Sequence, residues 1–281
     1  MPHISFGAQK SKKDRRDHRD KNLALSPVYP QKYDVDMKNI APFYQGKIGV
    51  CTAAALVCAI IEQLYREKNK KHIRLSVAFL YIVTKKIIDK NNSEGSSLRS
   101  ALKAAYKFGV CTEETFPTDV ELSHAEFLAQ TIPEKAWTEA LNYTIGGYIS
   151  VPLDESLMAA HMYKYGPLYA RFEVSHTWFT PSWLEKDISP LISGKPILSG
   201  HAVALVGYDL SIDKKGMWLR NSWGPTWFRN GDGFFNYRDY KPTEVWAVSL
   251  DSTMGMQEQS SFLSDIHRGF LNVLRRIGML W

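Results

Sequence analysis

A cysteine stands at the start of a predicted helix, where its sulfur could be activated for nucleophilic attack. Cys51 is followed at once by residues 52–56, a run of Thr, Ala and Leu that favours helix. The unsatisfied N–H groups of a helix N-terminus favour thiolate over thiol, and the thiolate is the nucleophile. Gln45 precedes Cys51 by six residues, with two glycines between them. Its side-chain amide is therefore expected to curl back beside the sulfur and donate to an oxyanion.

His201 is the histidine, among eight, that the pattern marks as a general base. It follows Gly200 and opens residues 202–208, an apolar run of strand length. Asn221 follows a second short apolar stretch. We expect Asn221 to accept the imidazole Nδ1–H, which would leave Nε2 facing the sulfur, and Trp223 to cover that bond against water.

Three blocks of this sequence resemble the papain family of cysteine peptidases, and they occur in that family's order. The blocks are Gln-Gly…Gly-x-Cys at 45–51, Gly-His-Ala-Val…Val-Gly-Tyr at 200–208, and Asn-Ser-Trp-Gly at 221–224. The resemblance extends over about residues 33–250. It implies a peptidase with Cys51 as nucleophile, His201 as base, Asn221 as orienting residue and Gln45 as oxyanion donor.

The resemblance also implies a reaction course. Cys51 and His201 would form a thiolate–imidazolium pair, with the pKa of the thiol below its free value. The sulfur would attack the scissile carbonyl, with Gln45 and the Cys51 N–H holding the oxyanion, and water would hydrolyse the resulting thioester. The substrate contacts expected by resemblance are Gly95, Ser96, Gly200 and Trp223, with Ser96 in place of the second of two family glycines.

The sequence departs from the secreted members of that family near the nucleophile. Ile48 stands where they carry a second cysteine, and Thr52 stands where they carry a tryptophan. Bacterial and other non-secreted relatives often read Cys-Thr-Ala at this point, as this chain does. We therefore expect a member of the non-secreted type without a long prosegment.

Helical patterns precede strand patterns along the chain, which is typical of an α+β protein with two lobes. The resemblance implies a helical lobe and an antiparallel β-barrel-like lobe, with the active site in the cleft between them. Helices are expected at 51–68, 77–90, 98–108, 123–130, 134–142 and 154–165. Strands are expected at 168–174, 202–208, 216–220, 233–237 and 245–250.

We predict three regions. Residues 1–32 form a basic, flexible leader; residues 33–250 form the peptidase domain, with the helical lobe at 45–145 and the sheet lobe at 146–250; residues 251–281 form an amphipathic helix. Residues 1–22 carry net charge +4 of the +6 of the whole chain, so the body itself is nearly neutral and nucleic acid is not an expected partner. Residues 257–281 could pack on the domain, or dock on a partner or membrane surface.

The composition sets further bounds. No apolar stretch reaches membrane-spanning length. The first residues do not show the basic segment followed by an apolar core that is typical of a secretory signal. Three cysteines are too few and odd in number for a disulfide framework, so we expect a cytoplasmic protein or one delivered by a non-classical route, such as a virion component or injected effector. No cofactor or metal site is expected, because Cys51 and Cys58 lack a matching histidine pair.

The residues leave other functions open. An amidase, a transpeptidase or a deubiquitinase-like enzyme would share the first half-reaction and use another acyl acceptor. A catalytically silent binding module with the same fold is a further alternative. If the chain is a peptidase, its expected partner is a polypeptide substrate.

Overall fold

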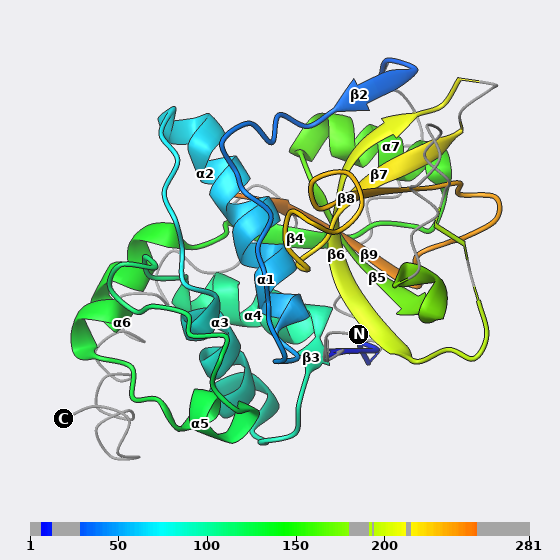
Figure 1. Cartoon of the computed structure of the whole chain (residues 1–281). Coiled ribbons are helices and arrows are strands. Elements are labelled where there is room, and N and C mark those ends of the chain that lie inside the picture. The colour runs from blue at the N-terminus through cyan, green and yellow to red at the C-terminus, as the bar shows by residue number, and fades with distance from the viewer. Residues whose placement is uncertain (1–6, 13–28, 180–190, 193, 212–214, 252–281) are drawn as a thin grey trace.

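The structure is a computed structural model that describes residues 7–12, 29–179, 191–192, 194–211 and 215–251. Helices predominate in the first half of the described chain and strands in the second, and the two groups lie on opposite sides of helix α1 (Figure 1). This is the predicted α+β, two-lobed arrangement. The C-terminal helix predicted for 251–281 falls outside the described residues, apart from Asp251.

One continuous helical run carries the predicted nucleophile at its first residue. It consists of α1 (Cys51–Leu56), the π-helical segment η2 (Val57–Ile61) and α2 (Glu62–Asn69). Every residue from 51 to 61 is buried, because apart from Thr52 all of them are apolar. The helix predicted for 51–68 is confirmed, and its π-helical middle is the feature that periodicity did not predict.

Two of the remaining helices begin at the predicted residues, 77 and 98, and each has a serine as its N-cap. The Ser76 hydroxyl accepts the Phe79 N–H at 3.0 Å, and the Ser97 hydroxyl accepts the Ser100 N–H at 3.1 Å. Gly109, with a φ of 70°, ends the helix that Ser97 begins. The remaining helices are α3 (Val77–Val83) with its π-helical continuation η3 (Thr84–Asp89), α4 (Leu98–Phe108), α5 (His124–Ala129), α6 (Glu134–Ala140) with the 3-10 turn η4 (Leu141–Tyr143), and α7 (Glu155–Tyr165).

The second lobe is built on one antiparallel sheet of seven strands. Its order is β4-β9-β5-β6-β7-β8, with β2 also paired to β6. The five predicted strands are all present, whereas β4 and β2 were not predicted as strands. The members are β2 (Lys32–Asp34), β4 (Gly147–Ser150), β5 (Leu168–Val174), β6 (Ser199–Asp209), β7 (Gly216–Arg220), β8 (Asp232–Phe235) and β9 (Glu244–Ser249).

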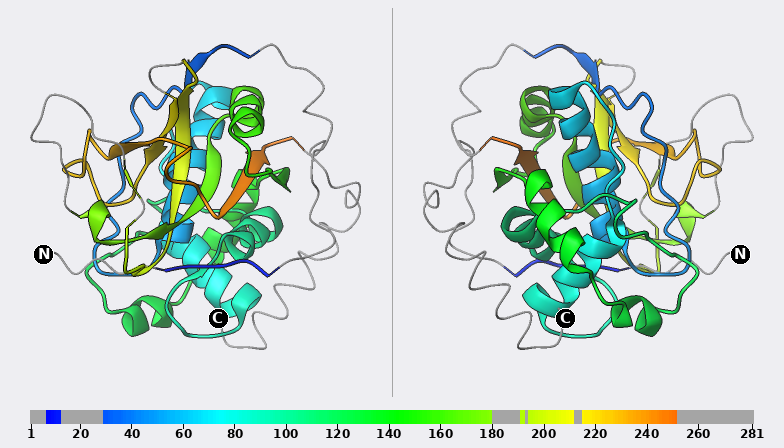
Figure 2. Two further views of the ribbon diagram at one scale, coloured as in Figure 1. Left: turned by 90° about the vertical axis from the view of Figure 1, so that its right-hand side faces the viewer. Right: turned by 90° about the vertical axis from the view of Figure 1, so that its left-hand side faces the viewer.

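The two lobes meet where α1 packs beside β6, and both views in Figure 2 keep this helix next to that strand. The Tyr169 hydroxyl on β5 donates to the Thr52 carbonyl at 2.7 Å, a buried bond that joins the helix to the sheet. The start of α1 is thereby held against the strand that carries His201. Within the described residues, no helix combines the length and apolar character needed to cross a bilayer.

A third pairing lies at the same junction and involves residues from the start of the chain. Strand β1 (Ala8–Gln9) pairs in parallel with β3 (Ser96–Ser97), immediately before α4. Residues 7–12, called the N-terminal strap from here on, thus lie at the lobe junction. The polar composition of this stretch predicted a flexible leader, but the strap is held by backbone pairing that composition does not reveal.

Candidate active site

Cys51 is the first residue of α1, as predicted, and it is fully buried. The backbone N–H groups of Ala202 and Gly7 hydrogen-bond its sulfur, so Cys51 contacts both β6 and the strap. Burial raises the pKa of the thiol to about 11, although these N–H groups oppose the change. The expected low thiol pKa is therefore wrong for the described state, because desolvation outweighs the charge of the helix end.

His201 and Asn221 lie together, but through the ring nitrogen opposite to the one expected. The imidazole Nε2 lies 2.7 Å from Asn221 Oδ1, whereas Nδ1 had been predicted to make this contact. The geometry explains the difference. Nδ1 is the ring nitrogen nearer the backbone, whereas Nε2 lies at the far end of the ring and reaches Asn221, which follows β7.

Aromatic rings enclose the imidazole and remove it from water. The Trp223 ring lies against it, with ring centroids 4.9 Å apart, which matches the covering role expected of Trp223. Trp178 adds an edge contact at 5.9 Å and is itself fully buried. Burial lowers the pKa of His201 to about 4, against a smaller raising effect of the Asn221 hydrogen bond. The imidazole is thus neutral at pH 7 in this state.

Gln45 is joined to the Asn221 block by both its backbone and its side chain. Its N–H donates to the Ser222 carbonyl at 2.9 Å, and the Ser222 hydroxyl donates to Gln45 Oε1 at 2.6 Å. One N–H of its amide group donates to the Ile48 carbonyl at 3.0 Å. The carboxamide is therefore fixed with its nitrogen turned toward the loop that leads into Cys51.

The predicted substrate contacts Gly95, Ser96 and Gly200 all touch the strap. The Ser96 N–H donates to the Gly7 carbonyl at 2.7 Å, and the Gly95 Cα lies 3.0 Å from the position that a Gly7 Cβ would take. A Cβ on Gly200 would lie 2.1 Å from the Ala8 carbonyl oxygen, so only glycine permits this approach. The strap occupies the positions where the resemblance placed a substrate.

Charged side chains hold the strap from the domain side. Arg171 Nε donates to the Ala8 carbonyl at 2.9 Å, and the Arg99 guanidinium donates to the Lys12 carbonyl. The Glu244 carboxylate accepts the Ser11 N–H at 3.2 Å. Sequence reasoning missed Arg99, Arg171 and Glu244, because their partners are backbone groups of a segment more than 80 residues away in the chain.

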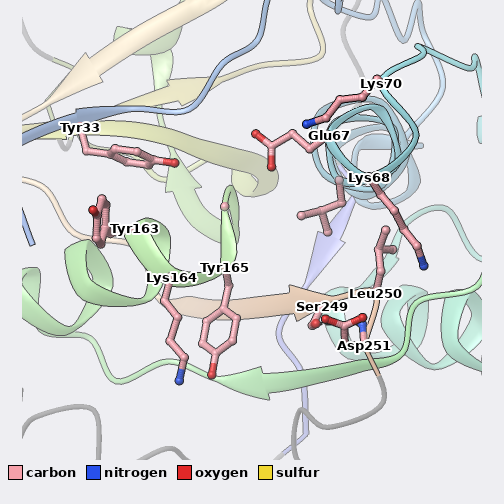
Figure 3. A pocket seen from close by; sticks show the side chains of 12 residues that line it. Tyr33, Glu67, Lys68, Lys70, Tyr163, Lys164, Tyr165, Ser249, Leu250 and Asp251 are labelled. Atoms are coloured by element: carbon pink, nitrogen blue, oxygen red, sulfur yellow. Dashed lines mark hydrogen bonds between the residues drawn. The ribbon is translucent and has the colours of Figure 1, made fainter. Parts of the chain in front are cut away.

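A separate cavity of about 790 Å³ lies between α2, α7, β2 and the end of β9 (Figure 3). Its lining carries lysines, acidic residues and three tyrosines, and it includes none of the predicted site residues. Charges of both signs line it, including Lys70 and Glu67. Among the described residues no group of three or more His, Cys, Asp or Glu side chains is arranged to hold a metal ion.

The fold and this site define a class of two-lobed α+β proteins in which a buried cysteine begins a central helix and a histidine hydrogen-bonds an asparagine on the neighbouring sheet. Comparison with known proteins gives the family. A profile of papain family cysteine proteases matches residues 29–250, and the chain belongs to this family.

Curated relatives are similar over parts of the chain. The "Probable cysteine protease RD19D" of Arabidopsis thaliana is 31% identical over 149 residues, which are 50% of this chain and 37% of that protein. The "Cathepsin B-like protease 1" of the same plant is 33% identical over 131 residues, 46% of this chain and 32% of that protein. The chain thus spans about a third of the length of these two relatives.

A solved structure supports the fold. The crystal structure of xylellain, a cysteine protease from Xylella fastidiosa, superimposes with a TM-score of 0.72 at 23% identity. The match covers 88% of this chain and 97% of that one. At this identity the likeness concerns the fold alone.

Proposed function

We propose that this chain is a cysteine peptidase that hydrolyses peptide bonds through Cys51, His201 and Asn221. The observation that carries the proposal is the convergence of three distant sequence blocks. Asn221 holds the imidazole at 2.7 Å, the residue after that histidine donates its N–H to the Cys51 sulfur, and Ser222 holds Gln45. These contacts support the assignment of Cys51 as nucleophile, His201 as base and Asn221 as its orienting residue.

In the proposed reaction His201 takes the thiol proton through Nδ1, since Nε2 is engaged with Asn221. The sulfur attacks the scissile carbonyl, and the oxyanion accepts hydrogen bonds from the Gln45 amide and the Cys51 N–H. The imidazolium protonates the leaving amine, and water then hydrolyses the thioester. The substrate is a polypeptide, and its backbone would take the place of the strap at Ser96 and Gly200.

The experiment compares Cys51→Ala with Cys58→Ala. The control makes the same substitution at a buried cysteine in the next segment of the same helical run. We expect Cys51→Ala to abolish cleavage of a denatured protein substrate and Cys58→Ala to retain it, because Cys58 lies in η2, about two helical turns beyond Cys51. Cleavage fragments are read by mass spectrometry. Activity that survives in Cys51→Ala would remove the basis of the proposal.

A further inference from the structure

Lys85 is a fully buried cation that the proposed mechanism does not use. A buried ammonium is costly unless its hydrogen bonds are satisfied, and this one donates to three acceptors. It lies 2.7 Å from the Gly95 carbonyl oxygen, 2.7 Å from Asn91 Oδ1 and 3.3 Å from Asp89 Oδ2. All three partners belong to the segment between α3 and α4, so Lys85 organises the loop that precedes β3.

The loop of residues 91–96, called the pairing loop below, is built around this cation. The Lys85 carbonyl accepts the Asn91 N–H at 3.2 Å, and the Ser96 hydroxyl donates to Asp89 Oδ2 at 2.7 Å. Lys85 and Asp89 both lie in η3, and π-helical turns occur frequently at functional sites.

Gly95 has both of its backbone groups turned inward. Its N–H donates to the Tyr81 hydroxyl at 2.9 Å, and its carbonyl accepts from Lys85. Its φ of 79° requires glycine. With Gly95 fixed in this way, the next N–H, that of Ser96, faces the junction and donates to the Gly7 carbonyl at 2.7 Å. Ser96, rather than Gly95, is therefore the residue that presents a backbone donor there.

The pairing loop is also fixed to the loop before the nucleophile. Glu94 Oε1 accepts the Gly49 N–H at 2.8 Å, and a Cβ on Gly49 would lie 2.8 Å from Glu94 Cγ. The position of Ser96 relative to Cys51 thus depends on the conformation of the pairing loop. Lys85 stabilises that conformation through its three hydrogen bonds.

From these contacts we infer that Lys85 is a positioning residue for substrate binding. It holds the Gly95 carbonyl so that the Ser96 N–H meets a carbonyl of the bound peptide. This inference rests on the proposed peptidase function and deepens it, because it assigns to Lys85 the support of Ser96, which the resemblance already gives as a substrate contact.

The test is a ratio of two alkylation rates of Cys51 in the full chain. A dipeptidyl fluoromethyl ketone carries a peptide backbone that can pair with Ser96, whereas iodoacetamide carries none. Both reagents reach the sulfur only when the strap has left it, so the open fraction cancels in the ratio. Lys85→Met should lower the ratio about fivefold, the value of one hydrogen bond of about 1 kcal/mol. Lys86→Met, at the exposed neighbouring position, should leave it unchanged.

Lys85→Met leaves Asp89 without its ammonium partner and could impair folding. The double variant Lys85→Met/Asp89→Asn removes both charges and should show the same fall in the ratio. An unchanged ratio in a folded variant, with both rates equal to wild type or both reduced in parallel, would assign Lys85 a purely structural role and overturn the inference. A wild-type Cys51 that reacts with neither reagent would instead count against the proposed function.

Discussion

Gly7 offers a direct way to lift the strap from the nucleophile. A Cβ added at this position would lie 2.2 Å from the Gly49 carbonyl oxygen and 2.9 Å from the Gly49 carbonyl carbon. Both atoms belong to the backbone just before Cys51, so neither can move as a flexible side chain would. The φ of Gly7 is not in the left-handed region, and Ala could adopt it. The clash therefore acts on the seated strap alone.

The expected size follows from the cost of overpacking. Inserting a methyl group into a packed contact costs about 1–3 kcal/mol, and here that cost falls on the closed state. The equilibrium between seated and displaced strap should therefore shift by roughly 5- to 150-fold toward the displaced state. Gly7→Ala would also weaken the bond between the Gly7 carbonyl and the Ser96 N–H, which acts in the same direction.

The assay is the rate of iodoacetamide alkylation at Cys51, followed by peptide mapping so that Cys58 and Cys111 are counted separately. Gly7→Ala should accelerate alkylation of Cys51 at least fivefold. Lys10→Ala, at an exposed position of the strap, should leave the rate unchanged. Alkylation in Gly7→Ala at the wild-type rate would refute the reasoning, because it would mean that the strap does not limit access to the sulfur.

Three further outcomes are expected. Asn221→Ala should lower kcat for peptide hydrolysis about tenfold, since His201 loses the bond that orients it; steady-state kinetics measure this, and a wild-type kcat would contradict it. Ser222→Ala removes the hydroxyl that holds Gln45 Oε1 and should lower kcat about fivefold with little change in KM, and an effect on KM alone would speak against an oxyanion role. Burial lowers the pKa of His201 from 6.5 to about 4, so the stability present above pH 6.5 should decline as the pH falls toward 4, by about 3 kcal/mol. Urea unfolding of His201→Gln should show a flatter profile over that range, and an equally steep profile would locate the acid sensitivity elsewhere.

The sequence predicted those elements whose signals are local. Ser76, Ser97 and Asp154 begin helices where their side chains can accept an N–H three residues on. Strands β5 and β7 have the predicted limits, because apolar runs bounded by turn residues specify short buried strands. The π-helical segments η2 and η3 were not predicted, since a single wider turn barely alters the spacing of apolar residues.

Long-range contacts set the limit of what the sequence could predict at the site. The pair of His201 and Asn221 was expected, but the ring nitrogen that makes the contact depends on where the sulfur lies relative to β6. Placement of the strap depends on close backbone contacts at Gly7 and Gly200, where a Cβ would clash. It also depends on the hydrogen bond from the Arg171 guanidinium. None of these contacts leaves a periodic signal.

The raised pKa of Cys51 shows why the helix-end argument was insufficient. A helix N-terminus stabilises a nearby anion by about 0.3–1 kcal/mol. A thiol pKa raised from 9.0 to about 11 corresponds to about 3 kcal/mol in the opposite direction, so burial dominates while the strap is seated. Burial also lowers the pKa of His201, and both shifts favour the neutral thiol and imidazole. Displacing the strap would return water to the sulfur and weaken the larger effect. A thiolate–imidazolium pair is therefore expected in the open state, and the strap would control the charge of the nucleophile as well as access to it.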